Sequence, residues 1–285
     1  MGYVYANDEN GFAKINADTL SWTHAESEPG WSELPANRRP TVVNQTDVLK
    51  VANGTLIKAT KADLTIDTTT SYQGATESFP LAVDKEGYVW VLYSPDGSDS
   101  LYIQRLDPET FDVYREMAWG DVTTNPILSF QLKGDYVALL LNTGLEVYEI
   151  NYDGVLGDLV AETAEAITDA HTLFWHPTLD LLVVGLSLFT GEIQTYSYTP
   201  ASGSVATISL QHTYVHEEDQ TTPLDYVVDS EGYLYVLSRS RVNKFTQELS
   251  LIDTHMRTDS SHVMMCMAIT LDDKIVIYEY ELQLT

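Results

Sequence analysis

Six short apolar segments recur along the chain at intervals of roughly 45 residues, and each is apolar at consecutive rather than alternate positions. They begin at Val48, Tyr88, Tyr136, Leu181, Tyr233 and Ile275, so the intervals are 40, 48, 45, 52 and 42 residues. A β-strand with one face in water alternates apolar and polar side chains, whereas a strand buried on both faces is apolar throughout. Each segment is therefore predicted to be a strand that other sheets cover on both sides.

The sequence around each buried strand predicts a unit of four strands. A second apolar run precedes most of the buried strands, and two amphipathic runs follow most of them; after Tyr88 these are residues 101–107 and 111–117. A repeated four-stranded unit of about 45 residues is typical of a β-propeller blade, whose inner strands lie between neighbouring blades. The one helix candidate, residues 158–170, combines good helix formers with a weak apolar stripe.

Counting these units predicts a single domain, residues 1–285, with an all-β β-propeller fold of six four-stranded blades and seven as the alternative. Five complete units run from about Thr41 to Met256. The chain ends supply three N-terminal runs and two C-terminal runs, residues 263–269 and 274–285. Closing one blade from both ends would join the ring and hide its edge strands. Because four strands are needed and five are present, one strand is surplus.

Two of the units share a turn motif. The sequence reads VDKEGYVWVLY from Val83 and VDSEGYLYVLS from Val228. The glycine suits the positive φ of a tight turn, and the aspartate can accept hydrogen bonds from the amides of that turn. Residues 228–245 match best, and residues 83–106 match in part, with SPDGSDS inserted between strands. On these residues the chain resembles the NHL-type and related six-bladed β-propellers, a resemblance that implies a fold and almost nothing about function.

An excess of acidic side chains narrows the classes of function. The chain has 42 Asp and Glu against 15 Lys and Arg, which gives a formal net charge of -27. Such a charge repels nucleic-acid phosphates and anionic lipid, so we expect neither nucleic-acid binding nor membrane insertion. The first residues, MGYVYANDEN, lack the basic and apolar regions of a signal peptide, which predicts a protein made in the cytoplasm.

The single cysteine, Cys266, excludes an internal disulfide framework and a cysteine-based zinc site, and its apolar surroundings in the sequence predict a buried side chain.

The basic residues are unevenly placed. Between Lys133 and Arg239 lie 105 residues that include 16 Asp and Glu and no Lys or Arg. This acidic stretch could face a basic partner protein or cations, or it could be a halophilic adaptation in which dense carboxylates keep the protein solvated. The second hypothesis requires a melting temperature that rises from low to molar salt.

Histidines and acidic loops are the candidates for a metal site. The densest group would suit a divalent metal or a pH sensor, although a plain acidic surface loop is the favoured interpretation; it comprises His212, His216, Glu217, Glu218 and Asp219.

A second pair of histidines, His171 and His176, flanks a strand run, and we expect it to serve packing and turns.

Calcium is the one cofactor that the acidic loops suggest. Asp96 and Asp99 lie in a loop rich in small residues but lack the spacing of an EF-hand. Together with Asp229 and Asp272 they are interpreted as turn residues, so the metal ligands stay unassigned.

No catalytic residue is assigned, because the sequence contains no G-x-S-x-G, H-E-x-x-H or P-loop pattern. Six-bladed lactonase-like enzymes, which the fold brings in by analogy, hold calcium with a Glu, Asn and Asp set that cannot be matched onto this chain. A glycan-binding propeller is a further alternative, because tryptophan rings can stack on sugars. Trp90 and Trp175 lie within strands and are expected in the core, which leaves Trp22, Trp31 and Trp119.

These features predict a non-catalytic interaction or structural module. Its partners would be other proteins, with virion subunits (a tail or capsid-associated position), a host-surface receptor or a glycan as the specific hypotheses. The alternative is a calcium-dependent, lactonase-like or glycan-binding six-bladed propeller.

Overall fold

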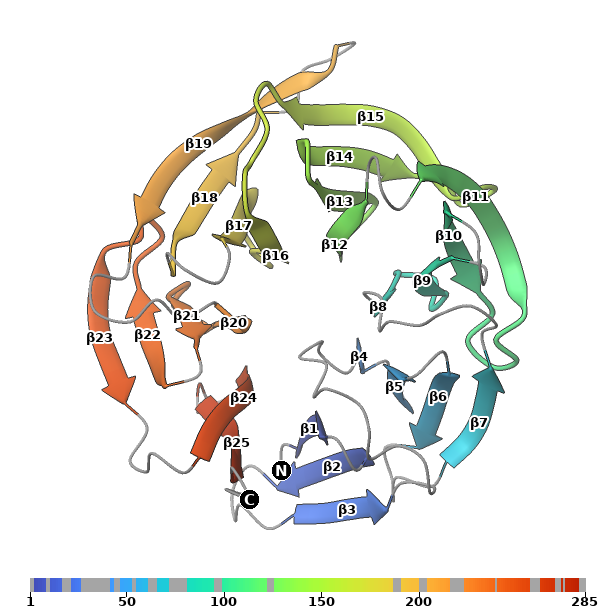
Figure 1. Cartoon of the computed structure of the whole chain (residues 1–285), viewed down its shortest axis with the longest axis horizontal. Helices are drawn as coiled ribbons and strands as arrows, with labels where there is room; N and C mark the ends of the chain where they lie inside the picture. Colours follow the sequence, from blue (N-terminus) through green and yellow to red (C-terminus); the bar gives the residue numbers. More distant parts are fainter. Residues whose placement is uncertain are drawn as a thin grey trace. The chain divides into compact units, whose positions relative to one another are not determined.

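The computed structural model describes residues 3–8, 11–16, 22–26, 42–43, 47–52, 55–60, 66–71, 81–94, 99–121, 126–186, 191–199, 204–215, 223–238, 240–256, 262–269, 273 and 275–281. Over these residues the chain is all-β, and most strands pair with their neighbours in sequence to form antiparallel meanders (Figure 1). No helix in this part of the chain is long and apolar enough to cross a membrane.

The chain divides into two compact units. Unit 1 comprises Met1–Ile127, Leu132–Val137 and Tyr148–Asp158, and unit 2 comprises Leu128–Gln131, Ala138–Val147 and Leu159–Thr285.

Unit 1 contains three complete sheets. The first is β1 (Tyr3–Asp8), β2 (Gly11–Asn16) and β3 (Trp22–Glu26); the second is β4 (Val42–Val43), β5 (Asp47–Ala52), β6 (Thr55–Thr60) and β7 (Ile66–Ser71); the third is β8 (Leu81–Val83), β9 (Val89–Tyr93), β10 (Ser100–Leu106) and β11 (Val113–Asp121).

The next meander, which contributes residues to both units, is β12 (Ile127–Lys133), β13 (Tyr136–Leu141), β14 (Gly144–Ile150) and β15 (Leu156–Thr163). Unit 2 continues with β16 (Ala170–Trp175), β17 (Leu181–Leu186), β18 (Ile193–Ser197) and β19 (Ala206–Tyr214). Its other sheets are β20 (Asp225–Val228), β21 (Leu234–Leu237), β22 (Arg241–Phe245) and β23 (Leu251–Met256), and then β24 (His262–Ile269) with β25 (Ile275–Glu281).

Two meanders are joined at their last strands. β15 and β19 pair in parallel, with Ala161 opposite Ala206 and Thr163 opposite Ile208, which makes one sheet of 8 strands. This pairing satisfies part of the outer edge of each meander, where backbone groups would otherwise be unpaired.

The strands predicted from the apolar repeat are confirmed, since every buried run coincides with a strand: β5, β9, β13, β17, β21 and β25. The helix candidate at residues 158–170 is wrong, because its first half belongs to β15 and its last residue begins β16. Helix propensity is a weak preference, and here pairing of β15 with both β14 and β19 overrides it.

Alternate side chains of an inner strand pack against different sheets. In β17, Leu182 and Val184 belong to the core shared with β12–β15, whereas Val183 packs with residues of β20, β21 and β22. In β21, Val236 belongs to that second core and Leu237 packs against Met267 of β24. This explains why these strands are apolar at consecutive positions.

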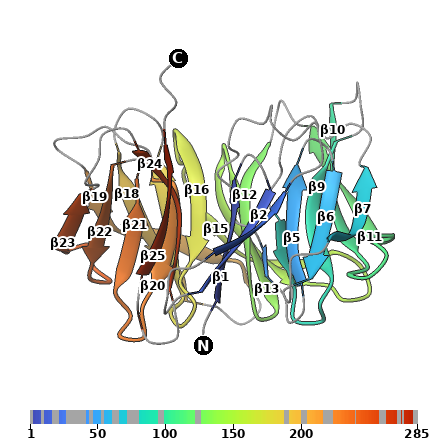
Figure 2. The same ribbon diagram turned by 90° about the horizontal axis from the view of Figure 1, so that it is seen from below.

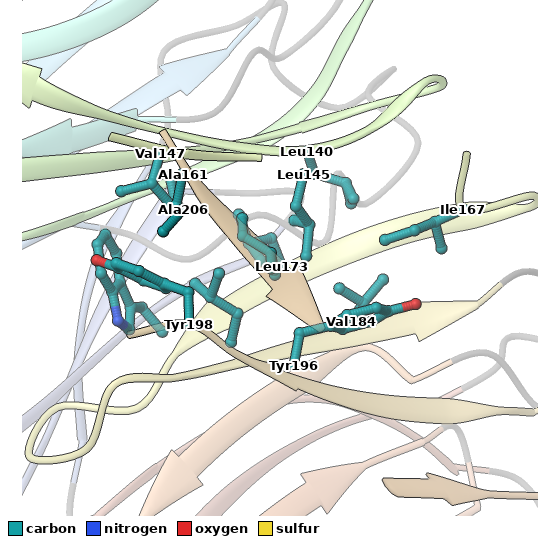
Figure 3. Close-up of a cluster of buried hydrophobic side chains, with 14 of the residues drawn as sticks. Leu140, Leu145, Val147, Ala161, Ile167, Leu173, Val184, Tyr196, Tyr198 and Ala206 are labelled. Carbon is teal, nitrogen blue, oxygen red and sulfur yellow. The ribbon is translucent and has the colours of Figure 1, made fainter. Parts of the chain in front are cut away.

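Figure 3 shows the largest described core, between the β13–β15 and β16–β19 meanders. Leu140, Leu145 and Val147 from the first meander face Leu173 and Tyr196 from the second, and all are at most 6% exposed. In unit 1, a matching core joins Leu49 and Leu56 to residues of β9 and β10. The described sheets are therefore built and packed as propeller blades.

Candidate functional site

Two aspartates organise the matched turns. Asp84 Oδ1 accepts the backbone N–H groups of Glu86 and Tyr88, both at 3.0 Å. Asp229 Oδ1 accepts the N–H groups two and four positions later, at 3.1 and 2.8 Å. The glycine three positions after each aspartate has φ of +94° or +86°, a region that other residues rarely adopt. The turn predicted from the repeated motif is confirmed.

The second oxygen of Asp84 holds a buried arginine. Arg105, from β10, donates to Asp84 Oδ2 through Nη2 at 2.8 Å and through Nε at 3.1 Å. Trp90 Nε1 donates to the same oxygen at 2.9 Å. Both charged side chains are 0% exposed, so the ion pair lies entirely inside unit 1.

Aromatic rings enclose the arginine. Its guanidinium carbon lies 4.8 Å from the ring centre of Tyr88, 5.7 Å from Trp90 and 5.3 Å from Tyr152. Arg105 Nη1 also donates to the carbonyl of Tyr152, at 3.0 Å. The charge is thus matched by a carboxylate, a carbonyl and ring faces, which makes Arg105 a tie between β10 and the turn after β14 rather than a reactive group.

Lys244 repeats this arrangement in unit 2. Its ammonium lies 3.4 Å from Asp229 Oδ2 and 4.1 Å from the ring centre of Tyr233, and the hydroxyl of Tyr235 donates to the same carboxylate oxygen at 3.0 Å. Burial alone would raise the pKa of Asp229, but the hydrogen bonds and Lys244 together lower it. The lysine side chain is 25% exposed, so this copy of the tie is wetter than the one at Arg105.

Asp225, the first residue of β20, is the most perturbed carboxyl group in the described structure. Its Oδ2 accepts the N–H of Met267 on β24 at 2.9 Å, and its Oδ1 accepts the N–H of Tyr226 at 2.8 Å. Burial raises the pKa of Asp225 to about 6, and the two hydrogen bonds offset only part of that effect. A partly buried carboxyl that titrates near neutral pH is a candidate acid or base.

The raised pKa of Asp225 predicts a pH-dependent difference in stability between the protein and its Asp225→Asn variant. Below about pH 4 the carboxyl is protonated in both the folded and the unfolded state; above about pH 6 it is ionised in both, and the folded state bears the cost of burial. Between these limits the wild-type protein should lose up to about 3 kcal/mol relative to the variant as the pH rises. Urea unfolding of both proteins from pH 4 to 7 measures this difference, and a constant gap would contradict the raised pKa.

The histidines predicted from the sequence are not assembled into a site among the described residues. His212 is exposed on β19, while residues 216–219 lie outside the described residues. His171 is exposed near the start of β16. His176 is buried, and its Nδ1 accepts the N–H of Leu179 at 3.2 Å, which agrees with the expected turn role.

The acidic candidates have separate positions. Asp99 is exposed just before β10, and Asp96 and Asp272 lie outside the described residues. Asp273, next to Asp272, accepts the N–H of Ser230 at 2.8 Å, so it links two turns. Within the described part of the chain, no group of three His, Cys, Asp or Glu side chains is placed to hold a metal ion.

The tryptophans divide as expected where they are described. Trp90 is 0% exposed and Trp175 is 5% exposed, so both belong to the core. Trp119 is partly buried and its ring meets that of Tyr148 edge-on at 5.9 Å. Trp31 and the side chains of Trp22 and Cys266 lie outside what the structure describes.

Sequence reasoning missed Asp225. The one signal was an acidic residue that opens the otherwise apolar run DYVV of β20. Because aspartate is common at strand ends and in turns, this signal could not be told from an ordinary turn residue without the contact to Met267.

Comparisons with known proteins support the fold class. No family model matches the chain, and no curated protein matches it. A functionally unknown protein from Desulfotomaculum acetoxidans superimposes with a TM-score of 0.67 at 12% identity, over 97% of this chain and 94% of that one. A proposed 6-phosphogluconolactonase from Bacteroides uniformis gives 0.61 at 14% identity, over 89% and 81%. A luciferin-regenerating enzyme gives 0.52 at 16% identity, over 81% and 78%.

The chain is an all-β protein of the β-propeller class, and this prediction is confirmed. The number of blades, the closure of a ring by the terminal strands and the single domain stay predictions. The resemblance to NHL-type repeats is supported only at the level of the propeller, since no family model matches.

Proposed function

We propose that this propeller is a lactonase-like hydrolase that opens uncharged cyclic esters, with Asp225 as the general base. The observation that carries the proposal is the environment of Asp225. This residue begins β20, the first strand of its sheet, and its carboxylate accepts a hydrogen bond from Met267 of the next sheet. Burial raises its pKa to about 6. The solved structures with the same fold, which include the proposed 6-phosphogluconolactonase, support the same reaction class.

Hydrolysis of a lactone is assisted by a general base such as the carboxylate of Asp225. Opening a lactone with water forms a bond from the water oxygen to the ester carbonyl carbon and breaks the bond to the ring oxygen. The base takes a proton from the attacking water and returns it to the ring oxygen as that oxygen leaves, and the new carboxylic acid then loses its proton to solvent. A carboxylate with a pKa near 6 is ionised at neutral pH and is a stronger base than an ordinary aspartate.

The charge of the chain favours an uncharged substrate. With a formal net charge of -27, the protein repels anions in solution. A phosphorylated lactone would approach against this field, whereas a neutral sugar lactone would not. The proposed substrate class is therefore neutral, in contrast to the phosphorylated substrate that the name of the Bacteroides uniformis protein implies.

The main hypothesis from the sequence needs no cofactor, and calcium, which belongs to the alternative of a calcium-dependent propeller, stays a hypothesis. The described side chains include no group of three potential ligands, so no ligand set can be assigned and no step of the hydrolysis is routed through the metal. Metal analysis of the purified protein decides whether calcium is bound.

The proposal predicts turnover of gluconolactone at a higher kcat/KM than 6-phosphogluconolactone. The Asp225→Asn variant should lose about 100-fold in kcat/KM, because the base can no longer accept the water proton. The acid limb of the wild-type pH profile, expected near pH 6, should disappear with it. Hydrolysis is followed by proton release in a weakly buffered solution.

Asp158→Asn is the matched control, because Asp158 is an exposed carboxyl on β15. It should leave both the rate and the pH profile unchanged. Absence of turnover on every lactone would overturn the hydrolase proposal, and full activity of a folded Asp225→Asn variant would remove Asp225 from the mechanism.

A second candidate function is a protein-binding platform, which the exposed apolar side chains of two outer strands favour. Leu210 and Val215 lie on or just after β19, and Leu251, Ile252 and Met256 lie on β23; all are between 44% and 51% exposed. The other hypotheses from the sequence stay hypotheses: the identity of the partner, a virion or host-surface role, glycan binding, high-salt adaptation and the place where the protein acts.

A further inference from the structure

β23 is an outer strand that, among the described strands, pairs on one side only and carries apolar side chains in solvent. It ends the sheet β20-β21-β22-β23, and Figure 2 shows it at the outer end of that sheet. Leu251, Ile252 and Met256 are 44%, 49% and 50% exposed, although together they make up half of the strand. An exposed apolar edge strand is a template for pairing with another strand.

Two of the other outer strands in the described structure cover each other's edges. β15 and β19 pair with each other. β11 carries the exposed charges of Arg115 and Glu116 beside the exposed Val113, and it pairs with β10 through two register shifts, whereas β22 and β23 pair through one; register shifts discourage edge pairing. β23 therefore differs from β15 and β19 in having no strand paired on its outer side among the described strands, and from β11 in having fewer register shifts.

We propose that β23 pairs antiparallel with β23 of a second copy of this chain, centred on Thr254. In this register Ile252 lies opposite Met256 of the other copy, and Asp253 lies opposite His255. The two-fold symmetric interface therefore contains two Ile252–Met256 pairs and two Asp253–His255 pairs. The product is a continuous sheet across the two copies, as β15 and β19 already form within one chain.

Neighbouring registers are less favourable. A pairing centred on Asp253 places two aspartates opposite each other, and like charges directly opposite each other in a sheet are destabilising. A pairing centred on His255 places Thr254 opposite Met256 and so loses the apolar pair. The register centred on Thr254 avoids both.

At the centre of the proposed interface, the backbone N–H of Thr254 can exchange its present hydrogen bond for one to the other copy. The N–H of Thr254 donates to Asp253 Oδ1 at 2.8 Å, so the carboxylate caps an amide of the edge strand. On pairing, Asp253 can turn to the partner's histidine. The side chain of Thr254 needs no change, since its hydroxyl already donates to Asn243 Oδ1 at 2.9 Å within its own sheet.

Net charge sets the conditions for pairing. Two copies of a chain with a formal net charge of -27 repel each other, and molar salt shortens the range of that repulsion to about 3 Å. The dimer should therefore strengthen as salt increases. This inference rests on the protein-binding platform and is independent of the hydrolase proposal.

Sedimentation velocity of the whole chain, over a concentration series in low and molar salt, tests the pairing. The wild-type protein should dimerise in molar salt, and Ile252→Lys should raise the dissociation constant about tenfold or more. Leu210→Lys is the matched control, because it places the same charge at a 51% exposed leucine on β19. It should leave the dimer intact.

A charge exchange tests the register. Asp253→Lys should weaken the dimer by removing the carboxylate that faces His255 of the other copy, and Asp253→Lys combined with His255→Glu should restore it by placing opposite charges across the interface. A monomer at all concentrations in molar salt would overturn the pairing. A dimer broken by Leu210→Lys and not by Ile252→Lys would place the interface on β19, which overturns the role of β23 while the platform itself stands. Thermal unfolding of each variant confirms that it is folded.

Discussion

Replacing Arg105 with methionine is expected to destabilise the protein by about 3 to 5 kcal/mol. The substitution removes one partner of a fully buried ion pair and leaves Asp84 without a positive charge. It also leaves the carbonyl of Tyr152 without the donor that now lies 3.0 Å away. Removing one partner of a buried pair costs more than the pair itself contributes, because the remaining charge stays out of water.

Urea unfolding followed by tryptophan fluorescence measures this effect. Lys244→Met is the matched variant in unit 2, where the lysine side chain is 25% exposed, so its cost should be smaller than that of Arg105→Met. Equal losses in the two variants would show that burial does not set the strength of the tie. Because Trp90 donates to Asp84, its emission should also change in the Arg105→Met variant.

Gly185→Ala is expected to destabilise the protein by about 3 kcal/mol, at the upper end of what overpacking costs. Gly185 lies in β17 opposite Thr172. A Cβ atom there would overlap the hydroxyl oxygens of Tyr226 and Thr172, which hydrogen-bond to each other at 2.7 Å, and would lie 3.1 Å from Pro223 Cβ. Since the proline ring cannot rotate away, β17 and the neighbouring sheet must shift.

The reason for this loss can be tested by a double substitution. Tyr226→Phe removes the hydroxyl that the new Cβ meets, so Gly185→Ala should cost less in the Tyr226→Phe background than alone. Thermal unfolding of the four proteins gives the coupling. Additive losses would mean that the overlap with Tyr226 is relieved in another way.

The arrangement of strands could be predicted from the sequence because it depends on local pattern. The run LLVVGL of β17 does not alternate between apolar and polar residues, and this alone indicates a strand covered on both faces, as the separate cores of Val183 and Val184 confirm. The Asp-to-Gly turn at Asp84 could be predicted for the same reason, since its donors lie within four residues. The helix predicted from Asp158 is wrong because the strand state of this segment depends on its pairing with β14 and β19, which helix propensity does not reflect.

The candidate site could not be predicted in this way. Asp225 is an ordinary acidic residue in the sequence, and its environment depends on Met267, 42 positions away. Arg105 is likewise an ordinary charged residue in the sequence, and only the folded structure places it between Asp84 and the turn at Tyr152. Neither contact leaves a pattern in the sequence near the residue.

The sequence by itself determined the repeated four-stranded unit, the burial of its inner strands and the acidic surface charge, because each depends on residue type and spacing along one stretch of chain. Only the tertiary structure decided which charged side chains are enclosed, which carboxyl has a pKa raised towards neutral pH and which outer strands pair with each other. Those properties depend on desolvation by segments distant in the sequence, and desolvation is set by the packing of one sheet on the next.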